Sequence, residues 1–265
     1  MSAPATVLIT GAASGIGHAL AHEYASTATT LLLLDVHPPE RTAAELSGRC
    51  TVRIAGADVR DAKAVAAAIE LVAEGRPIDR VLHCAGVLAP TAPAREVDPA
   101  DVQRTIDINL VGSFNVVHGA LPHLRAGAHL ALVASLGGLI AGYRYLAYSS
   151  SKFGVVGLAE SLRMELAPEG IRVQVICPGE VATPLIDEEL ASGDAVQRAV
   201  KLLSGKPITA EVAAAGIRRG VEKGRFMVIP TAQARWLWRF SRVAPTPLRL
   251  ASTDRAVRDA LRRAS

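Results

Sequence analysis

The 265-residue sequence has few cysteines, few aromatic residues and no long hydrophobic run. Its three cysteines, Cys50, Cys84 and Cys177, are far apart and form no CxxC pair, which argues against a disulfide framework and against a zinc site. We therefore expect no metal and a reducing, cytoplasmic compartment. The longest apolar stretch, 130–143, is interrupted by Ser135 and glycines, and is shorter than the ~20 residues needed to cross a bilayer.

Charge of one sign is also not concentrated anywhere. Lysine and arginine number 29 against 25 acidic residues, for a net charge of +4, and no basic block dominates. This distribution predicts no nucleic-acid partner. The N-terminus lacks a basic region before an apolar stretch, so no signal peptide is expected. Half of the residues are hydrophobic, which suits one large domain spanning 1–265.

Short apolar runs alternate with longer helical patterns along the chain. Strands are expected at 7–10, 30–35, 51–55, 78–84, 128–134, 171–176 and 226–229, and helices between them, including 62–73, 98–124 and 147–166. Strands that are apolar on both faces, alternating with helices, predict an α/β fold: a doubly wound parallel sheet of about seven strands with helices on both faces, as in a Rossmann fold.

A glycine-rich segment, Thr10-Gly-Ala-Ala-Ser-Gly-Ile-Gly17, joins the first expected strand to the first helix. Glycines let a backbone approach a pyrophosphate closely, and the following helix presents free N–H groups to the anion. We therefore predict cofactor contacts from Gly11, Ser14, Gly15, Ile16 and Gly17. The alternative is a glycine turn without a ligand.

Asp35 ends the second expected strand, 18 residues beyond Gly17. A carboxylate there can bind the adenosine ribose hydroxyls and would repel a 2′-phosphate. No arginine or lysine follows it directly, since the next residues are Val36, His37 and Pro38. The pattern favours NAD over NADP. The alternative is a solvated loop carboxylate.

Tyr148 and Lys152 share one face of the expected helix, four residues apart. A free tyrosine has a pKa near 10, and a nearby positive charge lowers it, so the pair can serve as an acid and base. Ser135 follows an apolar strand, at the carboxyl end where open α/β sheets place ligands. These three residues are the candidate catalytic centre.

At this point the chain resembles the short-chain dehydrogenase/reductase family over roughly residues 6–230. The motifs are TGAASGIG at 10–17, Asp58-Val59, Cys84-Ala-Gly86, Asn109, Ser135, YSSSK at 148–152 and Pro178-Gly-Glu-Val-Ala-Thr183. The resemblance implies that Ser135 polarises the substrate, Tyr148 is the acid/base, Lys152 lowers its pKa and binds the nicotinamide ribose, and Asn109 positions a water beside Lys152. It also implies cofactor contacts from Asp58, Val59, Ala85, Gly86, Tyr148, Lys152, Pro178, Gly179, Val181 and Thr183.

Several alternatives stay open. Ser135 could be only a strand-end cap, and Asn109 only a helix-start residue. Tyr143 and Tyr145 are rival phenols without a lysine four residues on. His83 and His118 could have catalytic roles, although single histidines are more often structural. The family usually has Asn-Asn where this chain has His83-Cys84, and Cys84 is expected to pack at the strand end.

The substrate side is expected to be apolar. The resemblance implies a flap near 185–206, and Leu136, Leu139, Ile140 and Tyr143 should line the pocket. No fixed charge stands out there, which favours a small hydrophobic ketone or secondary alcohol. The C-terminal half loosely resembles the 3-ketodihydrosphingosine reductase-like branch of the family.

The C-terminal tail, residues 231–265, contains an amphipathic pattern. Arg235, Arg239 and Arg242 recur at helical spacing beside Trp236 and Phe240. A basic amphipathic helix over 231–243 can lie on an anionic membrane as a peripheral contact, or it can pack on the domain or a partner subunit.

The sequence as a whole predicts an NAD(H)-dependent oxidoreductase that interconverts a secondary alcohol and a ketone. The alternative is an NAD-binding regulatory or scaffold protein without turnover. The helices after Asn109 and around Lys152 carry apolar residues on more than one face, so a homodimer or homotetramer is expected.

Overall fold

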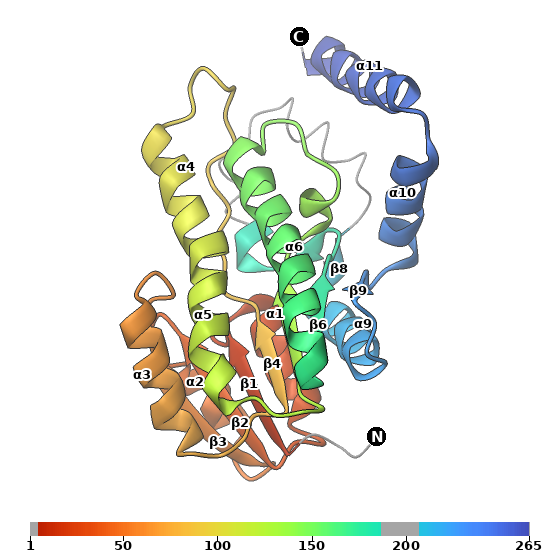
Figure 1. The fold of residues 1–265 in the computed structure, drawn as a ribbon. Coiled ribbons are helices and arrows are strands. Elements are labelled where there is room, and N and C mark those ends of the chain that lie inside the picture. The colour runs from red at the N-terminus through yellow and green to blue at the C-terminus, as the bar shows by residue number, and fades with distance from the viewer. Residues whose placement is uncertain (1–4, 187–206, 265) are drawn as a thin grey trace.

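The computed structural model describes residues 5–186 and 207–264, which form a single α/β domain with a helical tail (Figure 1). Its centre is a seven-stranded parallel sheet in the order β3-β2-β1-β4-β5-β6-β9. The strands are β1 (Thr6–Thr10), β2 (Thr30–Asp35), β3 (Thr51–Gly56), β4 (Arg80–His83), β5 (His129–Val133), β6 (Arg172–Ile176) and β9 (Met227–Val228). The predicted sheet is confirmed.

Helices cover both faces of this sheet (Figure 1). They are α1 (Gly15–Tyr24), α2 (Glu40–Glu45), α3 (Ala62–Ala73), α4 (Pro99–Ile106), α5 (Gly112–Ala120), α6 (Leu146–Leu166), α9 (Ala210–Glu222), α10 (Ala232–Val243) and α11 (Thr246–Ala264). All residues of β1 and β5 are buried, because each of these strands has a helical layer on either side. One hydrophobic cluster includes residues of α3, α5 and α6, and a second includes residues of α1 and α9.

Local signals explain where several helices begin. The Asp61 carboxylate accepts hydrogen bonds from two backbone N–H groups of α3, and Asp98 caps α4, whose first residue is Pro99. The region predicted as helical over 98–124 is helical through residue 123, but a π-helical turn at Asp107–Val111 separates α4 from α5. That turn contains Asn109, and such turns are frequent at functional sites.

Some elements lacked a clear sequence pattern. A second small sheet pairs β7 (Val181–Ala182) with β8 (Ile208–Thr209), and α9 follows β8 directly. Strands of two residues are too short for an alternating pattern to reveal them. This small sheet holds the segment after β6 against the rest of the domain.

The strand order reverses between β1 and β4, which are neighbours in the sheet although β2 and β3 intervene in the chain. Connections after β1 and β4 therefore run to opposite sides and leave a crevice at the carboxyl ends of the strands. The glycine loop after β1 and the segment 84–87 after β4 both lie there.

Beyond the sheet, α10 and α11 lie along one side of the molecule, and α11 is set apart from the strands (Figure 1). The predicted helix over 231–243 is confirmed as α10. Among the described residues, no helix is both long enough and apolar enough to cross a membrane.

Candidate active site

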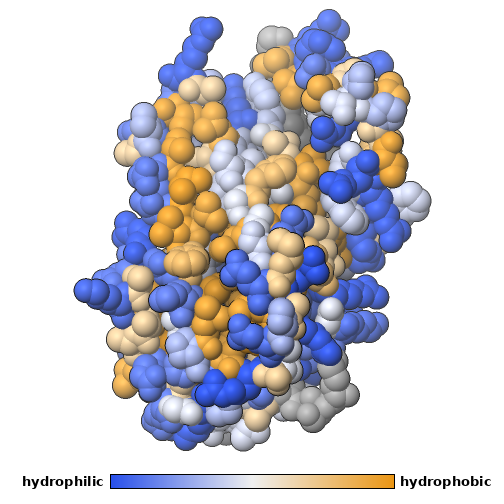
Figure 2. All heavy atoms as spheres, in the orientation of Figure 1, coloured by the Kyte–Doolittle hydropathy of each residue, from blue (hydrophilic) through white to orange (hydrophobic). Residues whose placement is uncertain are grey.

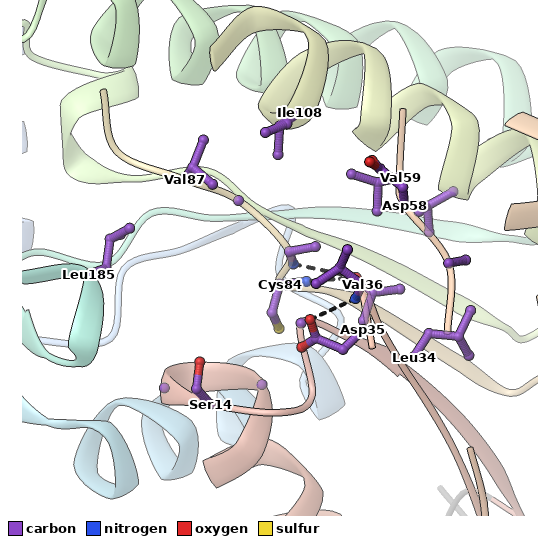
Figure 3. A pocket seen from close by; sticks show the side chains of 18 of the residues that line it. Ser14, Leu34, Asp35, Val36, Asp58, Val59, Cys84, Val87, Ile108 and Leu185 are labelled. Atoms are coloured by element: carbon purple, nitrogen blue, oxygen red, sulfur yellow. Dashed lines mark hydrogen bonds between the residues drawn. The ribbon is translucent and has the colours of Figure 1, made fainter. Parts of the chain in front are cut away.

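A cavity of about 360 Å³ opens at the strand-order reversal, and we call it the long cleft. Its walls come from the glycine loop and from the segments after β2, β3 and β4 (Figure 3). Eleven predicted cofactor residues line it: Gly11, Ser14, Gly15, Ile16, Gly17, Asp35, Asp58, Val59, Ala85, Gly86 and Thr183. Sequence reasoning did not single out its other lining residues, among them Leu34, Val36, Arg60, Val65, Val87, Arg104 and Ile108.

The glycine loop is packed too closely for side chains. Gly11 has a φ of +66°, and a Cβ there would lie 2.7 Å from the Ala85 backbone nitrogen. A Cβ on Gly17 would collide with the Gly11 carbonyl oxygen. The N-cap residue of α1, Ser14, makes no side-chain capping hydrogen bond and lines the long cleft. The start of α1 thus faces the cleft with backbone N–H groups suited to an anion.

The Asp35 carboxylate points into the cleft from the end of β2 (Figure 3). Its two oxygens accept hydrogen bonds from Ala13 N at 2.9 Å and Val36 N at 2.7 Å. These bonds fix the carboxylate, which is the group expected to bind ribose hydroxyls.

Two arginines near this end of the cleft were not foreseen. The Arg60 guanidinium pairs with Asp58 at 2.6 Å, and this hydrogen-bonded pairing holds the pKa of Asp58 below its ordinary value. On α2, Arg41 donates a hydrogen bond to the Ala13 carbonyl at 3.3 Å, and the backbone N–H of the same residue donates to Asp35. A basic side chain, that of Arg41, therefore reaches the region of Asp35 from α2, although no basic residue directly follows Asp35 in the chain.

The lining of the long cleft fits a nicotinamide dinucleotide. The glycine loop provides close backbone approach for phosphates, and Asp35 provides a carboxylate for a ribose. Val59, Val65 and Ile108 add apolar walls for a flat base. When bound, such a cofactor would supply or accept a hydride.

A smaller cavity of about 100 Å³, the central cavity, connects the long cleft to the rest of the site. It shares Gly86, Val87 and Thr183 with the long cleft. Its lining also includes six further predicted residues: Ser135, Tyr148, Lys152, Pro178, Gly179 and Val181. The structure thus brings together the serine, tyrosine and lysine that the sequence places on two different elements.

Ser135 and Tyr148 approach each other across Gly137. The Ser135 hydroxyl accepts a hydrogen bond from Gly137 N at 3.0 Å, which orients it after β5. A Cβ built on Gly137 would lie 3.4 Å from Ser135 Oγ and 3.5 Å from Tyr148 Cε1. Ser135 therefore caps the short helical turn that follows β5, a role close to the strand-end cap considered as the alternative, and it also lines the cavity that holds Tyr148.

Lys152 lies beneath this pair in a buried position. Its ammonium donates a hydrogen bond to the Val133 carbonyl at 3.1 Å and lies 5.7 Å from the centre of the Tyr148 ring. Burial lowers the pKa of Lys152 from 10.5 to about 8. The group is still mostly protonated at neutral pH, so it places a positive charge near the phenol.

Asn109 occupies the π-helical turn and is fully buried. Its amide oxygen accepts a hydrogen bond from Val87 N at 2.8 Å, and its amide nitrogen donates to Val87 O and Ser151 Oγ, both at 2.9 Å. Both amide hydrogens are therefore used to hold the backbone at Val87 and the α6 residue Ser151. Asn109 is more than a helix-start residue, and its side chain positions the wall of the central cavity.

The rival side chains have other surroundings. His83 is buried with its ring bonded to Thr10 Oγ1 at 2.7 Å, and burial lowers its pKa to about 3. Burial raises the pKa of Cys84 to about 12, which makes it a packing residue as expected. His118 is exposed and stacks on Phe114.

A third cavity of about 240 Å³, the apolar pocket, adjoins the central cavity through Ser135, Tyr148 and Gly179. Leu136, Ile140 and Tyr143 line it as predicted, together with Tyr145. The expectation for Leu139 was wrong, because it is not among the residues that line this pocket, and its side chain packs against the hydrophobic core.

The apolar pocket also has walls that sequence reasoning missed. Glu180 lies in the lining, so the expectation that the pocket has no acidic or basic side chain was wrong. Thr231, Ala234 and Leu237 at the start of α10 close another side. The tail is therefore part of the site. Leu185 and Ile186 reach the lining as well, while most of the predicted flap, residues 187–206, falls outside the described residues.

Comparison with known proteins agrees with this geometry. Residues 5–193 match the family described as short chain dehydrogenase. The 3-dehydrosphinganine reductase TSC10B of Arabidopsis thaliana is 36% identical over 231 residues, which cover 84% of this chain and 68% of the relative. Sulfoacetaldehyde reductase 2 of Chromohalobacter salexigens is 34% identical over 239 residues, covering 86% and 95% respectively. A short-chain dehydrogenase/reductase from Burkholderia phymatum, solved in complex with NAD, has a TM-score of 0.77 at 25% identity and covers 89% of this chain and 92% of its own.

The resemblance to the 3-ketodihydrosphingosine reductase-like branch is confirmed by the Arabidopsis relatives, of which a second, TSC10A, is 38% identical over 229 residues. The sheet order, the glycine loop and these matches together lead to one conclusion: the chain belongs to the short-chain dehydrogenase/reductase family and is an oxidoreductase.

Proposed function

We propose that this protein interconverts a secondary alcohol and a ketone on a hydrophobic substrate, with NAD(H) as the cofactor. The observation that carries the proposal is the central cavity, where Ser135, Tyr148 and Lys152 lie between the long cleft and the apolar pocket. A molecule held in the pocket meets these side chains where a nicotinamide ring would enter from the cleft.

In the direction of reduction, the Ser135 hydroxyl holds the substrate carbonyl oxygen and the Tyr148 phenol donates a proton to it. The Lys152 ammonium stabilises the phenolate that remains. The hydride for the carbonyl carbon would be supplied by a nicotinamide cofactor bound in the long cleft. In oxidation, the phenolate accepts the alcohol proton. Asn109 keeps the cavity wall in place through Val87 and Ser151.

Cofactor contacts are assigned to the lining of the cleft and the central cavity. Asp35 favours NAD, because its fixed carboxylate repels a 2′-phosphate. Val181 and Thr183, on and beside the β7 strand, would hold the carboxamide, and their position in the lining of the central cavity with Pro178 and Gly179 supports this assignment.

Substrate choice follows from the apolar pocket. Leucine, isoleucine and tyrosine side chains dominate the wall, and Glu180 is an acidic group among them. We infer a long or bulky ketone that carries a hydrogen-bond donor, such as an amine, near the carbonyl. The similarity to 3-dehydrosphinganine reductases supports a chain-like substrate of this kind.

The test is a set of matched ketones, with and without an amino group beside the carbonyl, offered with NADH and with NADPH and followed by absorbance of the reduced cofactor. We expect turnover with NADH and a lower KM for the amino ketones. A Glu180→Gln variant should raise KM for the amino ketones alone.

Tyr148→Phe should abolish turnover while NADH binding persists. A chain that binds NADH but turns over no ketone or alcohol of the set would favour the regulatory or scaffold alternative. Equal KM values for both kinds of ketone would contradict the proposed role of Glu180 in substrate choice. They would not contradict the proposed alcohol–ketone interconversion.

A peripheral membrane contact through the tail is a second part of the proposal. Trp236 is 73% exposed and Val243 80% exposed, beside Phe240 at 56%. Residues 231–265 contain eight arginines and two aspartates, so the tail carries +6 while the remaining chain carries −2. An apolar stripe with this charge fits an anionic lipid surface.

A further inference from the structure

Outside the active site, His18, His22 and Glu45 bring three ligand atoms within 4.8 Å of one another. His18 and His22 lie one turn apart on α1, and Glu45 is the last residue of α2. The Nε2 atoms of His18 and His22 lie 3.3 Å and 3.0 Å from the same oxygen, Glu45 Oε2. In a tetrahedral zinc site with bonds near 2.1 Å, ligand atoms are separated by about 3.4 Å. Both nitrogen–oxygen distances are therefore close to those around a shared ion, and the distance between the two histidine ligand atoms is at most 4.8 Å.

Thr42 decides which nitrogen of His18 carries its proton. The Thr42 hydroxyl donates to the Ala12 carbonyl at 2.9 Å, which uses its single hydrogen. It must then accept a hydrogen bond from His18 Nδ1, which is 2.9 Å away. In the neutral ring, Nε2 is consequently the nitrogen with the lone pair.

That lone pair faces a carboxylate oxygen, which is unfavourable unless a proton or a metal ion lies between them. On the second histidine, Nδ1 lies 3.5 Å from Arg49 Nη1, so the metal-free ring donates from Nε2 to Glu45. One of the two Nε2–carboxylate contacts thus has a donor, and the other lacks one when His18 is neutral.

We propose that His18, His22 and Glu45 form a binding site for a divalent transition metal ion such as Zn²⁺. Two imidazole nitrogens and one carboxylate oxygen suit this class of ion, and a fourth position is left for water. Thr42 is the positioning residue, because it fixes the ring of His18 through the other nitrogen. The earlier expectation of no metal was drawn from cysteine spacing and did not consider this histidine pair.

The charged neighbours define the conditions for binding. Arg41 Nε lies 3.7 Å from Glu45 Oε1, the oxygen that does not face the histidines, and Arg49 lies at the outer side of His22. Glu211, at the start of α9, places a negative charge near His18, opposite in sign to the charge of Arg41. To bind the ion through Nε2, the neutral His22 ring must carry its proton on Nδ1, so the Arg49 guanidinium has to move away from that nitrogen. A protonated histidine cannot bind the ion, so binding weakens as the pH falls.

The site would join α1 to α2 directly behind the glycine loop. Thr42 holds the Ala12 carbonyl and Arg41 holds the Ala13 carbonyl, so α2 already supports this loop. A bound ion adds a third connection between the two helices. We expect it to stabilise the loop without taking part in the reaction.

The experiment is titration of the metal-free, untagged full chain with Zn²⁺ by calorimetry at pH 7.5, and with Co²⁺ by visible absorption. We expect one Zn²⁺ per chain, and Co²⁺ bands typical of low coordination. Zn²⁺ should also raise the melting temperature.

Three variants and a control distinguish this site from adventitious binding. His22→Ala and Glu45→Gln alter half-exposed side chains and should each weaken Zn²⁺ binding at least tenfold, and Thr42→Val should weaken it 10–100-fold. His118→Ala, which removes an exposed histidine on α5, should change nothing. Absence of Zn²⁺ binding by the wild type, or equal affinity in wild type and His22→Ala, would overturn the proposal.

Discussion

Lys152 keeps its charge in a buried position, and this reduces the stability of the fold. Burial lowers the pKa of Lys152 to about 8. For a base whose pKa is lowered on folding, the cost is fully present below pH 8 and disappears as the pH rises toward 10.5, where the unfolded chain also loses its proton. A lowering of this size corresponds to roughly 3 kcal/mol at pH 7.

Replacing this lysine should therefore separate stability from activity. We expect Lys152→Met to reduce kcat by at least ~100-fold, because the charge beside Tyr148 is gone. Its melting temperature at pH 7 should equal or exceed that of the wild type, and the difference should shrink at pH 9.5. Scanning calorimetry at both pH values checks this, with the exposed Lys63→Met as control. A clear loss of stability at pH 7 would contradict it.

Asp35 is the residue that we expect to select the cofactor. We expect NAD to bind more tightly than NADP by about 1–3 kcal/mol, the scale of a misplaced charge beside a hydrogen-bonding carboxylate. Asp35→Ala should narrow this gap, and Arg41, which reaches the Ala13 carbonyl, should then favour the 2′-phosphate. Fluorescence titration of the single variant and of Asp35→Ala with Arg41→Ala measures both effects. Equal or tighter NADP binding by the wild type would exclude the NAD assignment.

At the scale of elements, α10 has two faces with different roles. Trp238 packs against the hydrophobic core of the sheet, whereas Trp236 is 73% exposed. Arg235 donates hydrogen bonds to the carbonyls of Ile229 and Pro230, so it does not belong to the exposed arginine stripe that the sequence suggested. Arg239 and Arg242 remain exposed.

This division predicts different outcomes for the two tryptophans. Trp238→Ala should lower the free energy of unfolding by about 3 kcal/mol, the low end for a packed aromatic, because the ring is only partly buried. Trp236→Ala should leave stability unchanged and weaken binding to anionic vesicles, as should Arg239→Glu with Arg242→Glu. Thermal melts and vesicle co-sedimentation at low salt check this. If the wild type does not bind vesicles even at low ionic strength, the membrane contact is excluded.

At the scale of the whole molecule, α5 and α6 leave large apolar side chains exposed, and Figure 2 shows hydrophobic atoms gathered over them. These are Phe114 on α5 and Leu146, Phe153 and Met164 on α6, with exposed fractions from 45% to 62%. An exposed apolar patch of this kind favours pairing of two copies about a two-fold axis.

We therefore expect a homodimer, or a tetramer built from it, that depends on this face. Phe114→Asp with Phe153→Asp should shift the protein to monomers in light scattering at micromolar concentration. Leu71→Asp, a substitution at an equally exposed leucine on α3, should not. A wild-type monomer under the same conditions would contradict the expectation.

The sequence by itself determined the sheet, the glycine loop and the pairing of Tyr148 with Lys152. Each of these depends on short-range spacing: alternation of apolar runs with helical patterns, glycines between a strand and a helix, and two side chains one helical turn apart. The expected and observed boundaries of the strands and helices differ by only a few residues, as at β4, because the local sequence specifies the ends of these elements only weakly.

Only the tertiary structure decided the remaining features. It brings Arg41 to the glycine loop beside Asp35, and it brings Glu180 and the start of α10 into the apolar pocket. It also brings the backbone of Val87 into contact with Asn109, and Glu45 into contact with His18 and His22. These contacts join residues on separate elements, and their placement follows from how helices pack on the twisted sheet. No local periodicity encodes such a contact, because the side chains that meet are adjacent in space and separated by intervening chain.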